Sequence, residues 1–86
     1  LDYKERKQLE KDLRKAEKEV EKLEQDIEKL EGEIEAIDAK MADPEQLKVL
    51  SEQEGFYDSY EAKKVSLEKK MRQWEAAQEN LQKVSE

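Results

Sequence analysis

The side chains in this sequence that could take part in chemistry are carboxylates, amines and a few aromatic rings. Its 86 residues include 24 Asp or Glu and 17 Lys or Arg, but no His and no Cys. Imidazole acid–base catalysis and thiolate metal sites are therefore excluded for this segment. Gly32 and Gly55 stand alone, so there is no glycine-rich loop of the kind that cradles phosphates. We expect the segment not to be an enzyme on its own and to hold no cofactor or metal.

Three carboxylates lie close together, at Glu33, Glu35 and Asp38. Such a cluster could bind a cation or form a carboxylate pair for acid–base work. Both uses need a pocket that excludes water and shifts a pKa, and two extended helices offer none. We therefore interpret these residues as part of a solvated helix face.

The basic residues are unevenly distributed, although the net charge of −7 argues against a nucleic-acid partner for the chain as a whole. Residues 31–62 hold ten acids and two bases, residues 63–86 four acids and six bases, and residues 1–30 ten acids and nine bases. A basic stripe near the two termini could follow a phosphate backbone without reading bases. The candidates for phosphate contact are Lys4, Arg6, Lys7, Lys11, Arg14, Lys15, Lys18, Lys69, Lys70 and Arg72.

An ordinary solvated surface is the alternative interpretation of these bases. Acid–base pairs three residues apart on a helix, such as Asp12 with Lys15 or Glu19 with Lys22, are typical of such a surface. From the residues alone, this interpretation is the more common of the two.

The element that must position these side chains is a long helix with a heptad repeat. From Leu9 to Met41 the apolar residues recur in steps of four and three, which places them on one side of a helix. The a positions are Leu13, Val20, Ile27, Ile34 and Met41, and the d positions are Leu9, Ala16, Leu23, Leu30 and Ile37. A seam of this kind is buried against another helix. We predict an all-α fold with an entry segment at residues 1–5 and a first helix over about 4–42.

A short turn near residues 42–46 is predicted to lead into a second helix over about 44–83. Asp43 can cap that helix, Pro44 suits its first turn and Gln46 can close a capping-box-like bond. Gly55 lies inside this helix, where we expect a kink, a bulge or a short break. The apolar stripe of the second helix is weaker and comprises Leu50, Tyr57, Tyr60, Leu67, Met71, Trp74 and Leu81. Its aromatic rings could stack on bases, but their spacing is more typical of packing.

A turn of about five residues joins neighbouring helices antiparallel, so we predict a two-helix antiparallel coiled-coil hairpin. In an antiparallel pair, facing residues have a constant sum of residue numbers, and a sum of 90 for the d positions gives layers of matched side-chain volume. In this register the smallest seam residue, Ala16, faces the largest, Trp74. The predicted pairs are Leu9 with Leu81, Ala16 with Trp74, Leu23 with Leu67 and Leu30 with Tyr60, and in the a layers Val20 with Met71, Ile34 with Tyr57 and Met41 with Leu50.

Charge favours this hairpin over a homo-oligomer. On one flank Glu19 would face Lys70 and Asp26 would face Lys63, although the other flank would set glutamates against one another. In a homodimer the acids beside the first seam would meet at every heptad. Exposed ion pairs are worth about 0–1 kcal/mol each, against about 1.5–3 kcal/mol for burying a Leu or Ile. Burial of the seam therefore provides the energy for helix pairing, and the charges only favour one partner over another. Because they favour the internal hairpin, we expect a monomer.

Length and hydropathy set the remaining expectations. Residues 1–86 suffice for one small domain. No apolar run could span a bilayer or serve as a signal peptide. The sequence does not begin with Met, so we expect it to belong to a larger protein.

Three short motifs, in order along nearly the whole chain, resemble the C-terminal domain of ABC-F ATPases of the Uup type. The first ten residues, LDYKERKQLE, are similar to that domain's LSYKE…LE opening. Ala42-Asp43-Pro44 resembles the turn between its two helices. Arg72-Gln73-Trp74-Glu75 resembles its closing signature, although Ala76-Ala77 stands where Glu-Leu is usual.

The resemblance implies a cytoplasmic bacterial protein with two ATP-binding domains, and their ATP and Mg²⁺, upstream of this segment and with no membrane domain. It implies an accessory coiled coil that binds DNA in the Uup branch and ribosomal RNA or tRNA more broadly. The acidic charge departs from that role, so we expect weak, salt-dependent contacts confined to the terminal basic stripe. The acidic turn end would point away from phosphates or toward a basic ribosomal protein. The alternative is a structural spacer or protein-docking coiled coil without nucleic-acid affinity.

Overall fold

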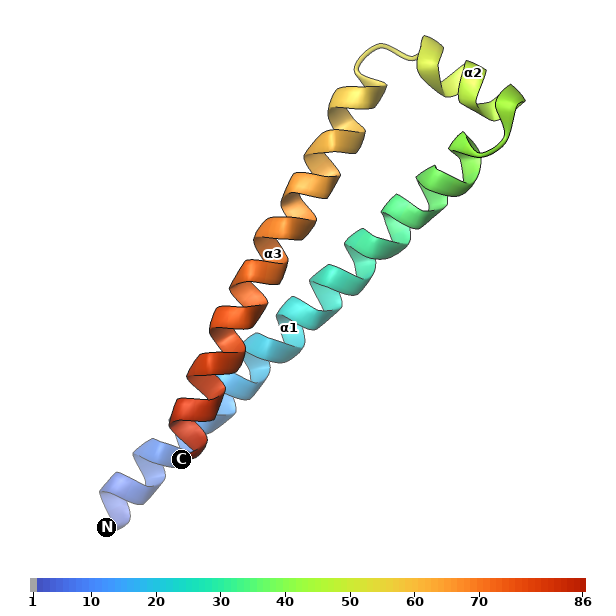
Figure 1. The fold of residues 1–86 in the computed structure, drawn as a ribbon. Coiled ribbons are helices and arrows are strands. Elements are labelled where there is room, and N and C mark those ends of the chain that lie inside the picture. Colours follow the sequence, from blue (N-terminus) through green and yellow to red (C-terminus); the bar gives the residue numbers. More distant parts are fainter. Residues whose placement is uncertain (1) are drawn as a thin grey trace.

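The chain folds into an elongated helical hairpin closed by a short third helix. The computed structural model describes residues 2–86, which form α1 (Tyr3–Met41), α2 (Pro44–Glu52) and α3 (Phe56–Ser85), with no strand among them. The molecule measures 66 × 17 × 15 Å. Figure 1 shows α1 and α3 side by side and antiparallel, with α2 across their far end and both termini at the other end. The all-α prediction is confirmed, whereas the predicted number of helices, two, is wrong.

α1 begins with a side-chain cap and ends at the predicted turn. Asp2 Oδ1 accepts a hydrogen bond from the backbone N–H of Glu5 at 2.9 Å, which satisfies one of the N–H groups that lack a partner at a helix start. The predicted entry segment is therefore helical from Tyr3 onward, and its first residue, Leu1, lies outside the described residues. At the other end the N–H of Ala42 donates to the carbonyl oxygen of Asp38 at 3.0 Å.

α2 starts where the sequence predicts a helix to start. Asp43 Oδ1 accepts from the backbone N–H of Glu45, and its Oδ2 accepts from the side-chain amide of Gln46, each at 3.0 Å. The Gln46 hydrogen bond, followed by that of the Glu45 backbone, lowers the pKa of Asp43. Pro44 occupies the first turn, where its missing N–H costs nothing. The predicted cap at Asp43 is confirmed.

The second predicted helix is interrupted in the way that Gly55 suggested. α2 ends at Glu52 because Gln53 adopts an extended conformation, with φ −75° and ψ 127°. Gly55 follows with φ 77°, in the left-handed region that glycine enters without a steric penalty. The short break expected near Gly55 is confirmed, and it divides the second helix predicted over about 44–83 into α2 and α3. The connection between the long helices thus runs from residue 42 to residue 55.

This longer connection shifts the register of the hairpin by one heptad. The structure pairs Lys70 Nζ with Asp26 Oδ2 and Lys63 Nζ with Glu33 Oε2, each at 3.3 Å. The sequence predicts Lys70 opposite Glu19 and Lys63 opposite Asp26. The observed partner of each lysine on α1 is therefore seven residues later than predicted, which is roughly 10 Å along the helix axis at about 1.5 Å per residue. The predicted register assumes that the chain turns back at residues 42–46. In the structure the nine residues of α2 cross the end of the hairpin before α3 begins.

The core lies in the half of the hairpin that is nearer the termini. It is a cluster of small and aliphatic side chains with larger ones against it: Val20, Leu23 and Ala77, contacted by Trp74 and Leu81. The predicted layer of Ala16 with Trp74 is wrong by the same heptad, because Trp74 packs on the cluster that contains Val20 and Leu23. Ala16 and Ala77 are 2% and 5% exposed, and their small side chains let the helices approach closely.

The side of α3 that faces α1 agrees with half of the predicted stripe: Tyr60, Leu67, Trp74 and Leu81 are half-buried as predicted, whereas the other seam position of each heptad lies one residue earlier than predicted. Its buried and half-buried side chains are Phe56, Tyr60, Lys63, Leu67, Lys70, Trp74, Ala77, Gln78, Leu81 and Val84. Tyr57 and Met71, predicted to be in the seam opposite Ile34 and Val20, are 53% and 42% exposed. The seam of α3 therefore runs through Lys63, Lys70 and Ala77 rather than through Lys64, Met71 and Gln78.

Candidate nucleic-acid interface

Six of the ten predicted phosphate contacts share one face of α1. We call this surface the basic face: it consists of Lys4, Lys7, Lys11, Arg14, Lys15 and Lys18, all exposed. Helical periodicity turns it away from the seam that α1 presents to α3. It extends for roughly 21 Å along the axis at about 1.5 Å per residue. Lys22 continues the face but was not among the predicted contacts. It shares the heptad position of Lys15, and this signal in the sequence could have identified it.

The first part of α1 projects beyond the end of α3. Val84, near the end of α3, lies beside Asp12 and Ala16, and Figure 1 shows the preceding turns of α1 continuing alone. Leu9 is accordingly 45% exposed although it belongs to the heptad seam. Arg6 is exposed here too, but on the seam side of the helix, so it does not join the basic face.

The amines of the basic face are free of strong carboxylate partners. Among residues 2–86 the ion pairs within 4.0 Å are Lys63–Glu33 and Lys70–Asp26, and neither involves this face. Lys7 is the member with a side-chain contact: its Nζ lies 5.5 Å from the ring centre of Tyr3 and donates to the Tyr3 hydroxyl at 3.4 Å. The predicted pairing of Asp12 with Lys15 is replaced by a hydrogen bond from Gln8 to Asp12 at 3.0 Å.

The three predicted contacts on α3 do not lie beside the basic face. Lys70 is drawn toward the seam by its 3.3 Å ion pair with Asp26 and is half-buried. Lys69 and Arg72 are exposed, at positions that turn away from α1. The one-heptad register shift moves all three farther from the termini than predicted. The structure therefore does not join them to the basic face.

The acids near α2 are occupied separately and do not converge on one point. Glu33 pairs with Lys63, and Asp38 accepts a hydrogen bond from the Tyr60 hydroxyl. The side-chain hydrogen bond with Tyr60 raises the pKa of Lys64, whose Nζ lies 4.4 Å from the Tyr60 ring centre. Within residues 2–86 no three carboxylates are arranged to hold a metal ion.

Trp74, Phe56 and Tyr60 serve packing, whereas Tyr57 is 53% exposed. Trp74 lies against the core cluster, and its indole N–H donates to Glu24 Oε1 at 3.2 Å. Phe56 and Tyr60, in the first turns of α3, stack with ring centres 6.3 Å apart. Neither Trp74 nor this pair adjoins the basic face, so base stacking by these rings is not part of the site.

Comparison with known proteins identifies one family. The family model described as ABC transporter C-terminal domain matches residues 11–79. Searches of curated proteins and of solved structures found no match. In the part of the chain that the structure describes, no helix combines the length and the apolar character that crossing a bilayer requires.

Proposed function

Because the chain belongs to the ABC transporter C-terminal domain family, we propose that it serves an ABC-F-type cytoplasmic ATPase by adding nucleic-acid affinity that does not depend on sequence. The family is one of accessory rather than catalytic domains, so the segment is not itself an enzyme. In this proposal ATP and Mg²⁺ are bound by ATPase domains upstream, and the hairpin attaches the enzyme to DNA or to ribosomal RNA or tRNA.

The observation that carries the proposal is the basic face. Six cationic side chains lie on the solvent side of a single helix with no carboxylate paired to them. Lysine and arginine in such a row neutralise successive phosphates and release condensed counterions, which gives affinity without base readout. Because α1 projects past α3 at this end, Lys4, Lys7 and Lys11 can meet a duplex without interference from the second helix, and Arg14, Lys15 and Lys18 lie alongside α3.

The acidic remainder of the hairpin limits how it can bind. Beyond Lys18, acids and bases alternate where the basic face continues toward α2: Glu21, Glu28 and Glu35 follow the heptad position of Arg14, and Lys22 and Lys29 follow that of Lys15. The acids oppose phosphate contact there, so we expect contact to be strongest near the termini. A net charge of −7 then makes the affinity weak and steeply dependent on salt.

Titration of labelled duplex DNA and of single-stranded RNA at several salt concentrations tests the proposal. A variant with Lys11→Gln, Arg14→Gln and Lys15→Gln loses three phosphate contacts. The slope of log K against log salt should then fall by about 2.7 for duplex DNA, at about 0.9 per contact. The matched control, Lys40→Gln, Lys48→Gln and Lys64→Gln, makes a similar charge change at exposed residues far from the basic face and should retain more of the slope.

Two results would decide against the proposal. If neither nucleic acid binds the chain at low salt, the basic face has no such role. If the two triple variants lose the same part of the slope, binding depends on net charge alone.

A further inference from the structure

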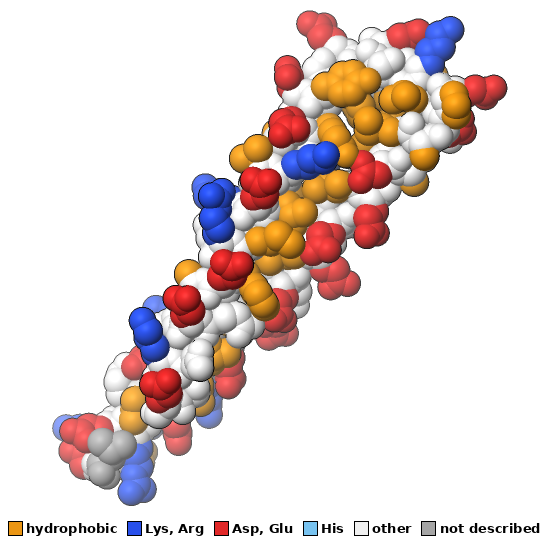
Figure 2. All heavy atoms as spheres, viewed as in Figure 1, with side chains coloured by type: hydrophobic (Ala, Val, Ile, Leu, Met, Phe, Trp, Pro, Cys, Tyr) orange, Lys and Arg blue, Asp and Glu red, His pale blue; other side chains and the backbone are white. Residues whose placement is uncertain are grey.

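A groove with an apolar floor runs between α1 and α3 on the flank opposite the two ion pairs. Its volume is about 660 Å³, and its floor is formed by Ile27, Met71 and Trp74. Its rims carry Glu24, Glu28, Glu31, Glu35 and Glu75. No basic residue lines it. Figure 2 shows this face, with a band of hydrophobic side chains bordered by carboxylates on both helices.

The groove is open because of two features of the chain. Gly32 lines it without a side chain, and a Cβ built there would meet no heavy atom within 4 Å. Met71 is 42% exposed, because the seam of α3 runs through Leu67, Lys70 and Trp74 and leaves this residue at its border.

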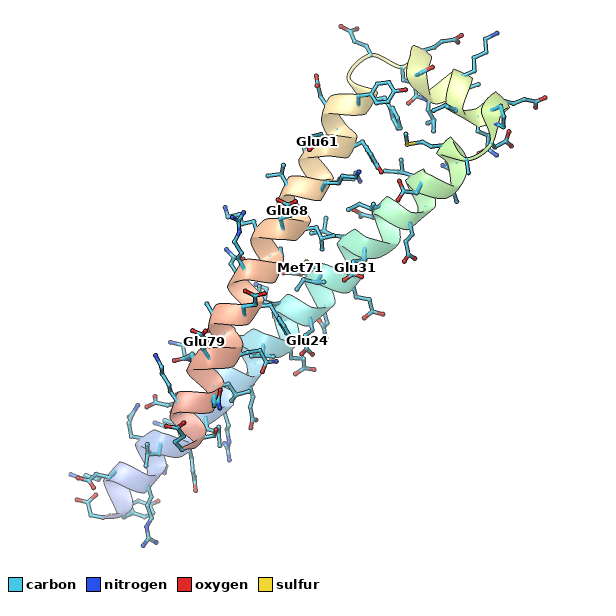
Figure 3. The ribbon with its side chains drawn as sticks, viewed as in Figure 1. Glu24, Glu31, Glu61, Glu68, Met71 and Glu79 are labelled. Atoms are coloured by element: carbon cyan, nitrogen blue, oxygen red, sulfur yellow. The ribbon has the colours of Figure 1, made fainter. Side chains whose placement is uncertain are left out.

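The rim carboxylates are poorly compensated within the chain. Glu24 accepts the Trp74 indole N–H at 3.2 Å, which leaves its negative charge in place. The ion pairs among residues 2–86 both lie on the other flank. Figure 3 shows Glu31 and Glu68 projecting from facing helices on either side of Met71. Like charges repel one another, so cations placed among the rim glutamates would stabilise the hairpin.

The arrangement of the acids selects the kind of cation. The four rim glutamates of α1 recur in steps of four, three and four residues, which distributes their charge along roughly 16 Å of helix at about 1.5 Å per residue. No three carboxylates converge within residues 2–86, so a single metal ion is a poor match. Phosphates are repelled. A partner helix that carries Lys or Arg at the same spacing is complementary in charge.

We infer that this groove docks an amphipathic, Lys/Arg-rich helix of a protein partner. One or two large apolar side chains of that helix pack on Ile27, Met71 and Trp74, and its flanking amines pair with the rim glutamates. Methionine suits such a floor because its flexible thioether adapts to different side chains. The groove and the basic face lie on different parts of α1, so a protein helix and a nucleic acid do not compete for one surface.

Trp74 provides the readout, because it is the only tryptophan in the sequence and lies in the groove. The probe is a short helical peptide with Leu on one face and Lys on the others, titrated into the full 86-residue chain at low salt. It should shift the Trp74 emission to shorter wavelength. A peptide with the same lysines but Ser for Leu should bind at least several-fold more weakly, because it cannot cover the floor.

Variants locate the site. The triple variant Glu28→Gln, Glu31→Gln and Glu35→Gln should weaken the Leu/Lys peptide by roughly tenfold, as the loss of three exposed ion pairs predicts. The matched control, Glu45→Gln, Glu52→Gln and Glu54→Gln, removes three carboxylates outside the groove and should bind nearly as well as the parent. Circular dichroism verifies that both variants remain helical.

Four results would overturn the inference: no binding of the Leu/Lys peptide at low salt, equal affinity for the Ser-containing peptide, equal loss in the two triple variants, or a sedimenting dimer that covers the groove with a second copy. None of these outcomes bears on the salt-dependent binding of nucleic acid by the basic face.

Discussion

Replacing Gly55 with Ala tests the break that sets the register of the hairpin. Gly55 has φ 77°, and no other residue between 2 and 86 has a positive φ. A side chain in the left-handed region costs about 1–2 kcal/mol. A Cβ at Gly55 would meet no heavy atom within 4 Å, so the backbone alone sets the cost. We expect Gly55→Ala to lower the free energy of unfolding by about 1–2 kcal/mol, and Gly55→Asn to lower it less, since Asn tolerates this conformation.

Gly32→Ala is the matched control for this prediction. Gly32 lies inside α1, and a Cβ there also meets open space. Alanine is favoured over glycine by about 0.8–1.0 kcal/mol in a helix interior, so we expect a gain of that size. The two substitutions add the same methyl group, and their opposite effects follow from backbone conformation alone.

Urea unfolding followed by far-ultraviolet circular dichroism measures both effects. In thermal unfolding each kcal/mol corresponds to roughly 4–8 °C in Tm for a domain of this size. A Gly55→Ala variant as stable as the parent, or more stable, would refute the left-handed break. That result is the one expected if residues 44–83 formed a continuous helix, in which Ala is the better residue.

Two further predictions concern the register and the cap. A double-mutant cycle between Asp26 and Lys70 should give a coupling of about 0.3–1 kcal/mol in urea unfolding, because the pair is 3.3 Å apart and partly exposed; coupling of Asp26 to Lys63 instead would support the register predicted from sequence. The stabilisation that Asp43 gives is complete above the ordinary pKa of 3.8 and is lost as pH falls through its lower folded pKa. Asp43→Ala should therefore lose this part of the acid dependence of Tm, and an unchanged profile would contradict the cap.

Much of the fold could be predicted because it depends on local patterns. The heptad stripe from Leu9 to Met41 specifies one long helix and its buried side, and α1 matches it. Asp43 and Pro44 mark the start of α2 because an Asp side chain caps a helix and Pro is favoured in its first turn. The effect of Gly55 on register could not be predicted in the same way. An isolated glycine can continue a helix or break it, and the choice depends on how the chain crosses the end of the hairpin.

The candidate sites differ in how far sequence could locate them. The basic face follows from the helical spacing of Lys4, Lys11 and Lys18, which lie on one helix. Lys70 could not be assigned correctly, since its pairing with Asp26 depends on the register. The same register decides that Met71 borders the glutamates of α1, so the groove is visible only in three dimensions.

The most direct test of the central claim, that the basic face of α1 contacts phosphates, is an NMR titration of the isotope-labelled chain with a short DNA duplex at low salt. We predict amide shift changes concentrated in residues 4–22 of α1, with the groove and α2 unaffected. Changes centred on α2 or on residues 69–72 of α3, or no changes at all, would contradict the account.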